Sequence, residues 1–230
     1  MNETIKDIPL NKLNPFPDHP FGVRDDEAMQ QTVESVREYG VLVPAIARPL
    51  EDGSYELISG HRRKRACELV GLSTMPVIIL DIDRDAATVI MVDSNIQREN
   101  ILPSEKAKAY KMKLEAIKRQ GARHDLTSSQ VETKLRADER VAQESGESRA
   151  QVQRYIRLTE LQPELQQMVD EGKIGMTPAV ELSYLKPTEQ KLLIDTIDSE
   201  QATPSLSQAQ RMKWLSQEGT HARRARVYEE

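Results

Sequence analysis

The 230 residues suffice for two small domains, and a content of 38% hydrophobic but only 4% aromatic residues predicts aliphatic cores in a mostly helical protein. A single cysteine excludes an internal disulfide, four scattered histidines lack zinc-ligand spacing, and no apolar run approaches the ~18 residues that span a bilayer, so we expect a cytoplasmic protein without membrane contact. The formal net charge of −5 excludes a basic surface over the whole chain, so any DNA-binding site must be local.

The first third of the chain alternates between helical and strand patterns. Met29, Val33 and Val36 lie at helical spacing, with Asp26 before them as a cap and Gly40 after them as a stop. Two β segments follow, VLVPAIARPL and YELISG, separated by an Asp-Gly turn. The basic run HRRKRACELV then predicts a helix, and MPVIILDI predicts a buried strand. This order indicates a small αβ domain.

From Asp85 onward the pattern is helical. Pro103 stands near the start of a long helical segment, and the polar stretch Gly121–Arg136 lacks an apolar stripe and is predicted to be a loop or linker. After Gln201 we expect one more helix, LSQAQRMKWLSQ, and then a polar tail. The fold class is therefore α+β, with an αβ domain at 1–100, a helical domain at 101–200, and a C-terminal helix and tail at 201–230.

A helix-turn-helix is predicted in RADERVAQESGESRAQVQRYIRL. Ala142 is small enough for two helices to approach, Gly146 permits the tight turn four residues later, and Val152 and Ile156 would pack the second helix against the first. Ser148 can cap that second helix. The alternative is an ordinary helical hairpin with solvated arginines.

The second helix of this motif carries the residues suited to DNA. Between Ser148 and Leu158 there are three arginines and no acid, so a local basic site exists in an acidic chain. Arg and Gln side chains have the donor geometry to contact guanine and adenine edges in the major groove. The candidate DNA-binding residues are Ser148, Arg149, Ala150, Gln153 and Arg154.

A second candidate site lies in ISGHRRKRA. Here a strand end, Gly60 and a helix N-terminus adjoin Arg62 and Arg63, and backbone N–H groups with guanidinium groups can bind an anion such as a phosphate. A polar cluster before Pro103 could close over the same anion. The alternatives are a solvated charged surface and an exposed loop. The candidate nucleotide-binding residues are Gly60, His61, Arg62, Arg63, Asn95, Arg98 and Glu99.

Taken together, the motifs resemble ParB-type partition proteins from about Ile5 to Leu215. The matching segments lie in family order: GVLVP, GHRRKRA, NIQRENILPSEKAKAY, GESRAQVQRYIRLTEL and LQQMVDEGKIGMTPAVEL. The resemblance implies a ParB/sulfiredoxin-like N-terminal fold, binding of CTP with Mg²⁺, and a helix-turn-helix domain that binds a centromere-like operator in double-stranded DNA. It further implies a nucleoid-associated homodimer that acts as a sliding clamp and works with a partition ATPase.

Several positions depart from the family pattern. His61 and Ser94 stand where the family usually has Glu, and Val43 stands where it usually has Gln. Because Ser94 offers no carboxylate, we expect a slow CTPase at most, and the sequence assigns neither catalytic residues nor metal ligands. The alternative function is a nucleotide-independent helix-turn-helix transcriptional regulator.

Two enzymatic readings are disfavoured. A sulfiredoxin needs a reactive cysteine beside the phosphate motif, whereas Cys67 takes an apolar-type position inside a helix. A nuclease needs a cluster of carboxylates, and the alternating Asp81, Asp83 and Asp85 are more typical of a solvated turn.

Overall fold

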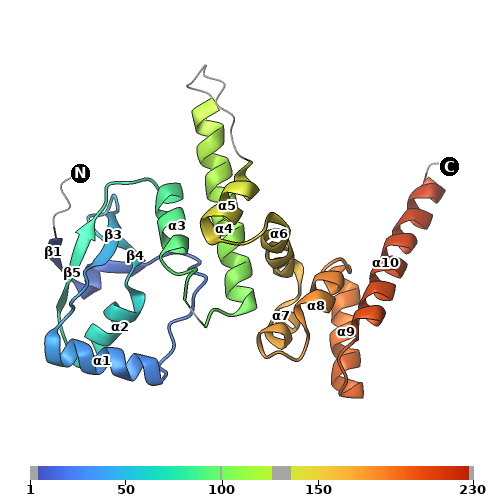
Figure 1. Ribbon diagram of the computed structural model, residues 1–230, viewed down its shortest axis with the longest axis horizontal. Coiled ribbons are helices and arrows are strands. Elements are labelled where there is room, and N and C mark those ends of the chain that lie inside the picture. Colours follow the sequence, from blue (N-terminus) through green and yellow to red (C-terminus); the bar gives the residue numbers. More distant parts are fainter. Residues whose placement is uncertain (1–4, 99, 126–135, 228–230) are drawn as a thin grey trace. The chain divides into compact units, whose positions relative to one another are not determined.

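The computed structural model describes residues 5–98, 100–125 and 136–227 and divides the chain into two compact units (Figure 1). The N-terminal unit comprises Met1–Arg98 with Met112–Lys134, and the C-terminal unit comprises Glu99–Lys111 with Leu135–Glu230. The long helix α4 (Pro103–Asp125) therefore contributes its first half to one unit and its second half to the other. Within the described ranges no helix combines the length and apolarity needed to cross a membrane.

The N-terminal unit is built on a five-stranded sheet with the order β1-β5-β3-β4-β2. The strands are β1 (Ile5–Pro9), β2 (Leu13–Pro15), β3 (Ala45–Pro49), β4 (Tyr55–Ser59) and β5 (Thr74–Ile79). β3 and β4 form the predicted antiparallel hairpin, and β5 lies parallel to β3. The predictions for these three strands are confirmed.

Two strands of the sheet were not predicted. β1 pairs antiparallel with β5, and β2 pairs parallel with β4. Their sequences, IKDIP and LNP, are short and contain prolines, and neither shows the run of alternating apolar residues that identifies a strand. These two segments become strands because each pairs with a neighbouring strand, and not because of their local β propensity.

The helices of the N-terminal unit are α1 (Glu27–Tyr39), α2 (His61–Val70), α3 (Arg84–Asp93) and the second half of α4. Among them, α1 and α2 begin and end where the sequence predicts. The side chain of Asp26 accepts a hydrogen bond from the backbone N–H of Met29 at 2.9 Å, and Gly40 follows α1 with φ 72°. α1 packs against α2, and buried residues of both helices share one core with the sheet.

The core of this unit is aliphatic, as its composition predicts. Its buried residues come from the sheet, α1 and α2: Ile8, Leu10, Leu13, Met29, Val36, Ala45, Ala47, Leu57, Ala66, Cys67, Met75 and Val77. Cys67 is fully buried, and desolvation by burial raises the pKa of its thiol. A buried, protonated thiol of this kind fills space in the core, which is the structural role expected for Cys67.

The C-terminal unit is helical throughout its described part. Its helices after α4 are α5 (Ala137–Ser145), α6 (Arg149–Arg157), α7 (Pro163–Asp170), α8 (Met176–Leu182), α9 (Pro187–Glu200) and α10 (Leu206–Val227). Its core is again aliphatic and is centred on Leu158, Leu165 and Leu182, which are almost fully buried. The α+β class, with an αβ unit before a helical one, is confirmed.

Two predictions of irregular structure are wrong in part. Residues 121–125 do not begin a loop but extend α4 to Asp125, and the rest of the predicted linker, 126–135, lies outside the described residues. The C-terminal tail likewise continues α10 as far as Val227. Adding residues to an existing helix is far easier than starting one, so neither extension needs an apolar stripe, and the α10 extension is also rich in Ala and Arg, which are good helix formers.

Candidate functional site

The connection from β4 to α2 is shaped for close approach. Gly60 has φ 107°, and a Cβ at this position would lie 2.8 Å from the Cβ of Ala45 and 3.3 Å from Nη2 of Arg63. Only glycine fits both the backbone conformation and the space. In the described part of the chain no side chain caps the start of α2, so N–H groups of its first turn can donate to an anion.

Arg63 lies over this turn. Its Nη1 donates hydrogen bonds to the carbonyl oxygens of Val43 and Pro44, the latter at 2.7 Å, which fixes the guanidinium beside Gly60. Burial, and then the positive charge of Arg98, lowers the pKa of Arg63. A guanidinium remains protonated at neutral pH even so, and a half-buried cation with a neighbouring cation is stabilised when an anion binds.

The other arginines of α2 face the segment before α1. Nη2 of Arg62 lies 3.3 Å from Oδ1 of Asp26, and Nη2 of Arg65 lies 2.8 Å from Oδ2 of Asp25. These contacts are exposed, so each contributes little to stability. Of the two, Arg62 is next to the anion-binding turn and Arg65 is three residues further along the helix.

His61, the first residue of α2, is paired with a second histidine. The ring centroids of His61 and His19 are 3.9 Å apart, and Nε2 of His61 accepts the backbone N–H of Phe16 at 3.4 Å. Burial lowers the pKa of His61 to about 3, with further contributions from the charges of His19, Arg98 and Lys64. The ring is therefore neutral and its proton is on Nδ1. No motif in the sequence singled out His19.

Of the candidate residues in the polar cluster before Pro103 that the structure describes, only Arg98 is seen to lie near the turn at Gly60. The charge of Arg98 lowers the pKa values of both His61 and Arg63, so Arg98 lies near them. Asn95 is instead buried at the end of α3, where its amide nitrogen donates to the carbonyl of Met91 at 2.7 Å and to Oγ of Ser94 at 3.1 Å. Glu99 lies outside the described residues.

The described residues include no group of three or more His, Cys, Asp or Glu side chains that could hold a metal ion. The acidic positions around the start of α3 have other contacts. Asp83 caps α3 by accepting the N–H of Ala86 at 2.8 Å, and Oδ1 of Asp85 lies 2.8 Å from Nε of Arg119. These contacts give two of the three aspartates that a nuclease would use as ligands a structural role in helix capping and packing.

The helix-turn-helix has the predicted geometry. Gly146 ends α5 with φ 71°, and its N–H bonds to the carbonyls of the last turn of α5. Oγ of Ser148 accepts the N–H of Gln151 at 3.1 Å and so caps α6. Val141 and Val152 are fully buried and join the two helices.

The outward side chains of α6 form hydrogen bonds with two neighbouring helices, α5 and α8. Nε of Arg149 donates to Oδ2 of Asp138 on α5 at 2.5 Å, and the amide of Gln153 donates to the same oxygen at 3.4 Å. Nη2 of Arg154 donates to Oγ1 of Thr177, on the first turn of α8, at 2.7 Å. Ser148, Arg149, Ala150 and Gln153 are exposed and Arg154 is half-buried, so all five predicted residues reach the surface. Asp138 is not among the residues that the motif singles out.

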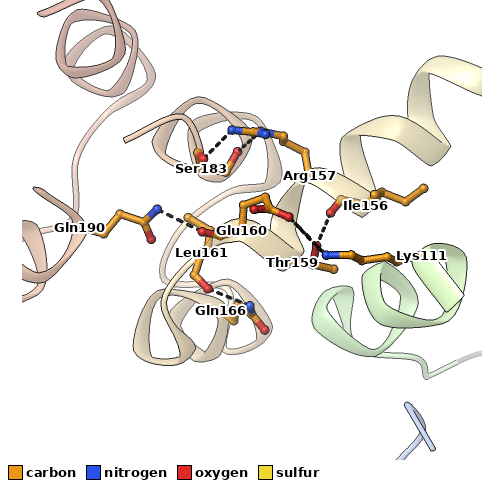
Figure 2. Close-up of polar contacts among 9 residues, drawn as sticks. All are labelled: Lys111, Ile156, Arg157, Thr159, Glu160, Leu161, Gln166, Ser183 and Gln190. Atoms are coloured by element: carbon orange, nitrogen blue, oxygen red, sulfur yellow. Dashed lines mark hydrogen bonds and ion pairs between the residues drawn. The ribbon is translucent and has the colours of Figure 1, made fainter. Parts of the chain in front are cut away.

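The C-terminal end of α6 is anchored by the contacts in Figure 2. Arg157 donates to Oγ of Ser183 at 3.0 Å and to its carbonyl oxygen at 2.8 Å. Just beyond the helix, Nζ of Lys111 lies 3.3 Å from a carboxylate oxygen of Glu160, whose backbone carbonyl accepts a hydrogen bond from the buried Gln190. This network ties α6 to α4 and α8 and orients its exposed N-terminal half.

Comparisons with known proteins place the two candidate sites in one family. Residues 1–96 match the ParB N-terminal domain model, and residues 126–212 match the ParB HTH domain model. The chain is 32% identical over 212 residues to Stage 0 sporulation protein J of Bacillus subtilis, covering 90% of this chain and 69% of that protein. It is 33% identical over 184 residues to the chromosome-partitioning protein Spo0J of Thermus thermophilus, covering 80% of this chain and 61% of that protein.

A solved structure has the same fold. The C-terminally truncated chromosome-partitioning protein ParB of Caulobacter crescentus, complexed to the centromeric parS site, aligns with a TM-score of 0.51 and 23% identity over 93% of this chain and 99% of that one. The chain spans 69% of the length of the Bacillus relative and 61% of the length of the Thermus relative. With two domain models matched in order and a relative 32% identical over most of both chains, the protein belongs to the ParB family.

Proposed function

We propose that this chain is a sequence-specific DNA-binding partition protein that recognises an operator through α6. The observation that carries this is the exposed N-terminal half of α6, where Arg149, Gln153 and Arg154 lie on a helix held by neighbouring helices. Such a helix fits the major groove, and its Arg and Gln side chains have the donor geometry to contact guanine and adenine. The role in partition follows from family membership and the names of the relatives.

The test for DNA recognition begins with selection of duplexes from a random-sequence library by the full chain. Arg149→Ala and Arg154→Ala are then compared with the parent on the selected duplex and on a scrambled one over a salt series. Loss of a bidentate base contact costs about 1–3 kcal/mol on the selected duplex alone, whereas loss of a phosphate contact weakens binding to both and lowers the salt slope. If both variants bind like the parent at every salt concentration, the assignment of α6 is wrong.

The N-terminal unit is proposed to bind a nucleoside triphosphate, and the family resemblance supports CTP as that nucleotide. What supports this is the convergence of donors at one turn: the glycine at position 60 that keeps the backbone accessible, the uncapped start of α2, and the cations Arg63 and Arg98. Phosphate charges are costly to bury unless fixed donors replace water, and these groups are such donors. Arg62 and His61 adjoin the same turn.

Ser94 and Asn95, at the end of α3, bear on the binding of Mg²⁺ and on the hydrolysis of CTP. No side chain is proposed as a ligand of Mg²⁺, since Ser94 has a hydroxyl where the family motif has a carboxylate, and that hydroxyl donates to the carbonyl of Met91 at 3.0 Å. Asn95 would have to leave its bonds to the end of α3 before it could contact a phosphate. Turnover of CTP is therefore expected to be slow or absent even where binding is intact.

Calorimetry tests the nucleotide site. CTP, ATP and GTP are titrated into the full chain with and without Mg²⁺, and CTP is compared with CMP. Arg63→Ala should remove most of the triphosphate affinity, because it deletes the half-buried guanidinium beside Gly60. Arg65→Ala is the matched control, since it removes the same charge from the same helix at an exposed ion pair.

A nucleotide-independent regulator is the second candidate, and the presence of His61 and Ser94 in place of acidic residues favours it. In that case the N-terminal unit would only dimerise or contact a partner. Absence of heat for every triphosphate, with Mg²⁺ and the selected duplex present, would leave this candidate standing. In the favoured case the protein acts as a homodimeric clamp on double-stranded DNA, and an ATPase of the partition type is its expected partner.

A further inference from the structure

One acidic side chain lies directly behind the DNA-facing residues of α6. Asp138, in the first turn of α5, accepts hydrogen bonds from Nε of Arg149 at 2.5 Å and from the amide of Gln153 at 3.4 Å. Its side chain is only 10% exposed, whereas that of Arg149 is 44% exposed. The carboxylate thus lies beneath the two side chains and not in front of them.

We propose that Asp138 is a positioning residue that sets the DNA sequence preference of this protein by holding Arg149 and Gln153 in one fixed arrangement. This inference rests on the proposed recognition of DNA by α6 and adds a residue from the other helix of the motif to it. Asp138 itself would not touch the DNA.

Besides Asp138, a second carboxylate lies near Arg149: Oε1 of Glu139 is 3.9 Å from Nη1, which is beyond hydrogen-bond distance, so the donors on the terminal nitrogens stay available to a base. A guanidinium has five N–H donors in a planar fork, and Asp138 takes the one on Nε at the side of the plane. The two terminal nitrogens form the end of the fork, which is the edge that pairs with O6 and N7 of guanine. Gln153 turns its amide nitrogen toward Asp138, so its amide oxygen is placed to accept a hydrogen bond from a base amino group.

Asp138 is well placed to stay ionised and in position. Partial burial opposes its ionisation, but the hydrogen bond and charge of Arg149, together with the charge of Arg136, hold the pKa of this carboxyl below its usual value. Its position in the first turn of α5 adds the favourable interaction of a carboxylate with a helix N-terminus.

The same features argue against an inhibitory role in which DNA pulls Arg149 away from Asp138. Departure of Arg149 would leave a mostly buried carboxylate without its closest partner, which is strongly unfavourable. Keeping the pair intact also spares the loss of side-chain freedom that an unrestrained arginine undergoes on binding. The contact is therefore retained in the complex and acts by preorganisation.

The test uses the full chain, a duplex selected from a random library by the parent protein, and a scrambled duplex of the same composition. Asp138→Asn removes the charge with little change in size. Glu144→Gln is the matched control, because it removes one charge from the same helix at a pair with Arg140, outside α6. Affinities for both duplexes, thermal unfolding, and a repeated library selection are measured for each variant.

For Asp138→Asn we expect affinity for the selected duplex to fall about ten-fold, which corresponds to about 1.4 kcal/mol. Affinity for the scrambled duplex should rise about two-fold, since a negative charge near phosphates is lost. The repeated selection should relax at the same base positions that Arg149→Ala relaxes. Glu144→Gln should leave the selected base preferences unchanged.

Other outcomes overturn the proposal. Increased affinity for both duplexes would make Asp138 an electrostatic brake, and equal loss on both duplexes with a lower melting temperature would make it a purely structural residue. Unchanged base preferences would also contradict it. Failure of the parent protein to select any sequence would instead refute the proposed DNA recognition itself, so the two failures are distinguishable.

Discussion

Burial and neighbouring charge set the protonation state of His61. Its ring lies against that of His19 and within the influence of Arg98 and Lys64, and these surroundings together keep it neutral with a pKa of about 3. A histidine whose folded-state pKa lies below its unfolded value near 6.5 gives a stability that is complete at neutral pH and is lost as the pH falls.

This gives a prediction for the pH dependence of the N-terminal unit. Between about pH 6.5 and 4.5 the unfolded chain takes up a proton that the folded chain refuses, so His61 should cost about 2–3 kcal/mol of stability at pH 4.5. His61→Gln should flatten that decline. The loss of stability is measured by hydrogen exchange of peptides from β3 and β4 in urea, at pH 7 and at pH 4.5. An equal decline in the variant would mean that His61 is not responsible.

Ser148 gives a second prediction at the scale of one side chain. Its hydroxyl satisfies the N–H of Gln151 at the start of α6, and Ser148→Ala should cost about 1 kcal/mol of stability. Ser199→Ala is the control, because its hydroxyl donates only to the carbonyl of Thr196 on an exposed helix. Urea unfolding monitored by the fluorescence of Trp214 reports on this unit. Equal effects of the two substitutions would contradict the capping role.

At the scale of an element, glycines with different backbone conformations have opposite roles. Gly146 ends α5 with φ 71°. This left-handed backbone conformation is energetically unfavourable for any residue that has a Cβ. Gly121 lies within α4 with an ordinary helical backbone and open space around it. The first glycine is required by the turn, and the second only weakens its helix.

The same substitution should therefore have opposite effects at the two positions. Gly146→Ala is expected to destabilise the C-terminal unit by about 1–2 kcal/mol, while Gly121→Ala should stabilise α4 by up to about 1 kcal/mol. Thermal unfolding by circular dichroism gives the direction for each variant. A stabilising Gly146→Ala would show that the turn of the helix-turn-helix does not depend on glycine.

At the scale of the whole molecule, the proposed nucleotide and DNA sites belong to different compact units. Gly60, Arg63 and Arg98 lie in the N-terminal unit, and Arg149 and Arg154 lie in the C-terminal unit. Each unit has its own aliphatic core, so a change in one site has no direct structural reason to damage the other.

Arg63→Ala should consequently leave sequence-specific DNA affinity in the absence of nucleotide within about two-fold of the parent. Any influence of CTP on DNA binding should disappear in this variant. Fluorescence anisotropy with the selected duplex, with and without CTP, checks both statements. A large loss of DNA affinity without nucleotide would mean that the two units do not act independently.

The sequence by itself determined the features that depend on local physics. Helix caps such as Asp26 and Ser148, the left-handed glycine at 146, the β3–β4 hairpin and the helix-turn-helix all follow from residues a few positions apart. Such features carry their signal in one short segment, because a cap or turn is stabilised by its own neighbours.

Only the tertiary structure decided the contacts between distant segments. β1 becomes a strand because β5 offers it a partner, and Asn95 turns inward because the end of α3 is buried. His61 is neutral because it is buried and because His19 and Arg98 come close to it. Asp138 meets Arg149 because the turn at Gly146 folds α5 back along α6. Burial and long-range pairing depend on the packed fold as a whole, so no local pattern of residues indicates them.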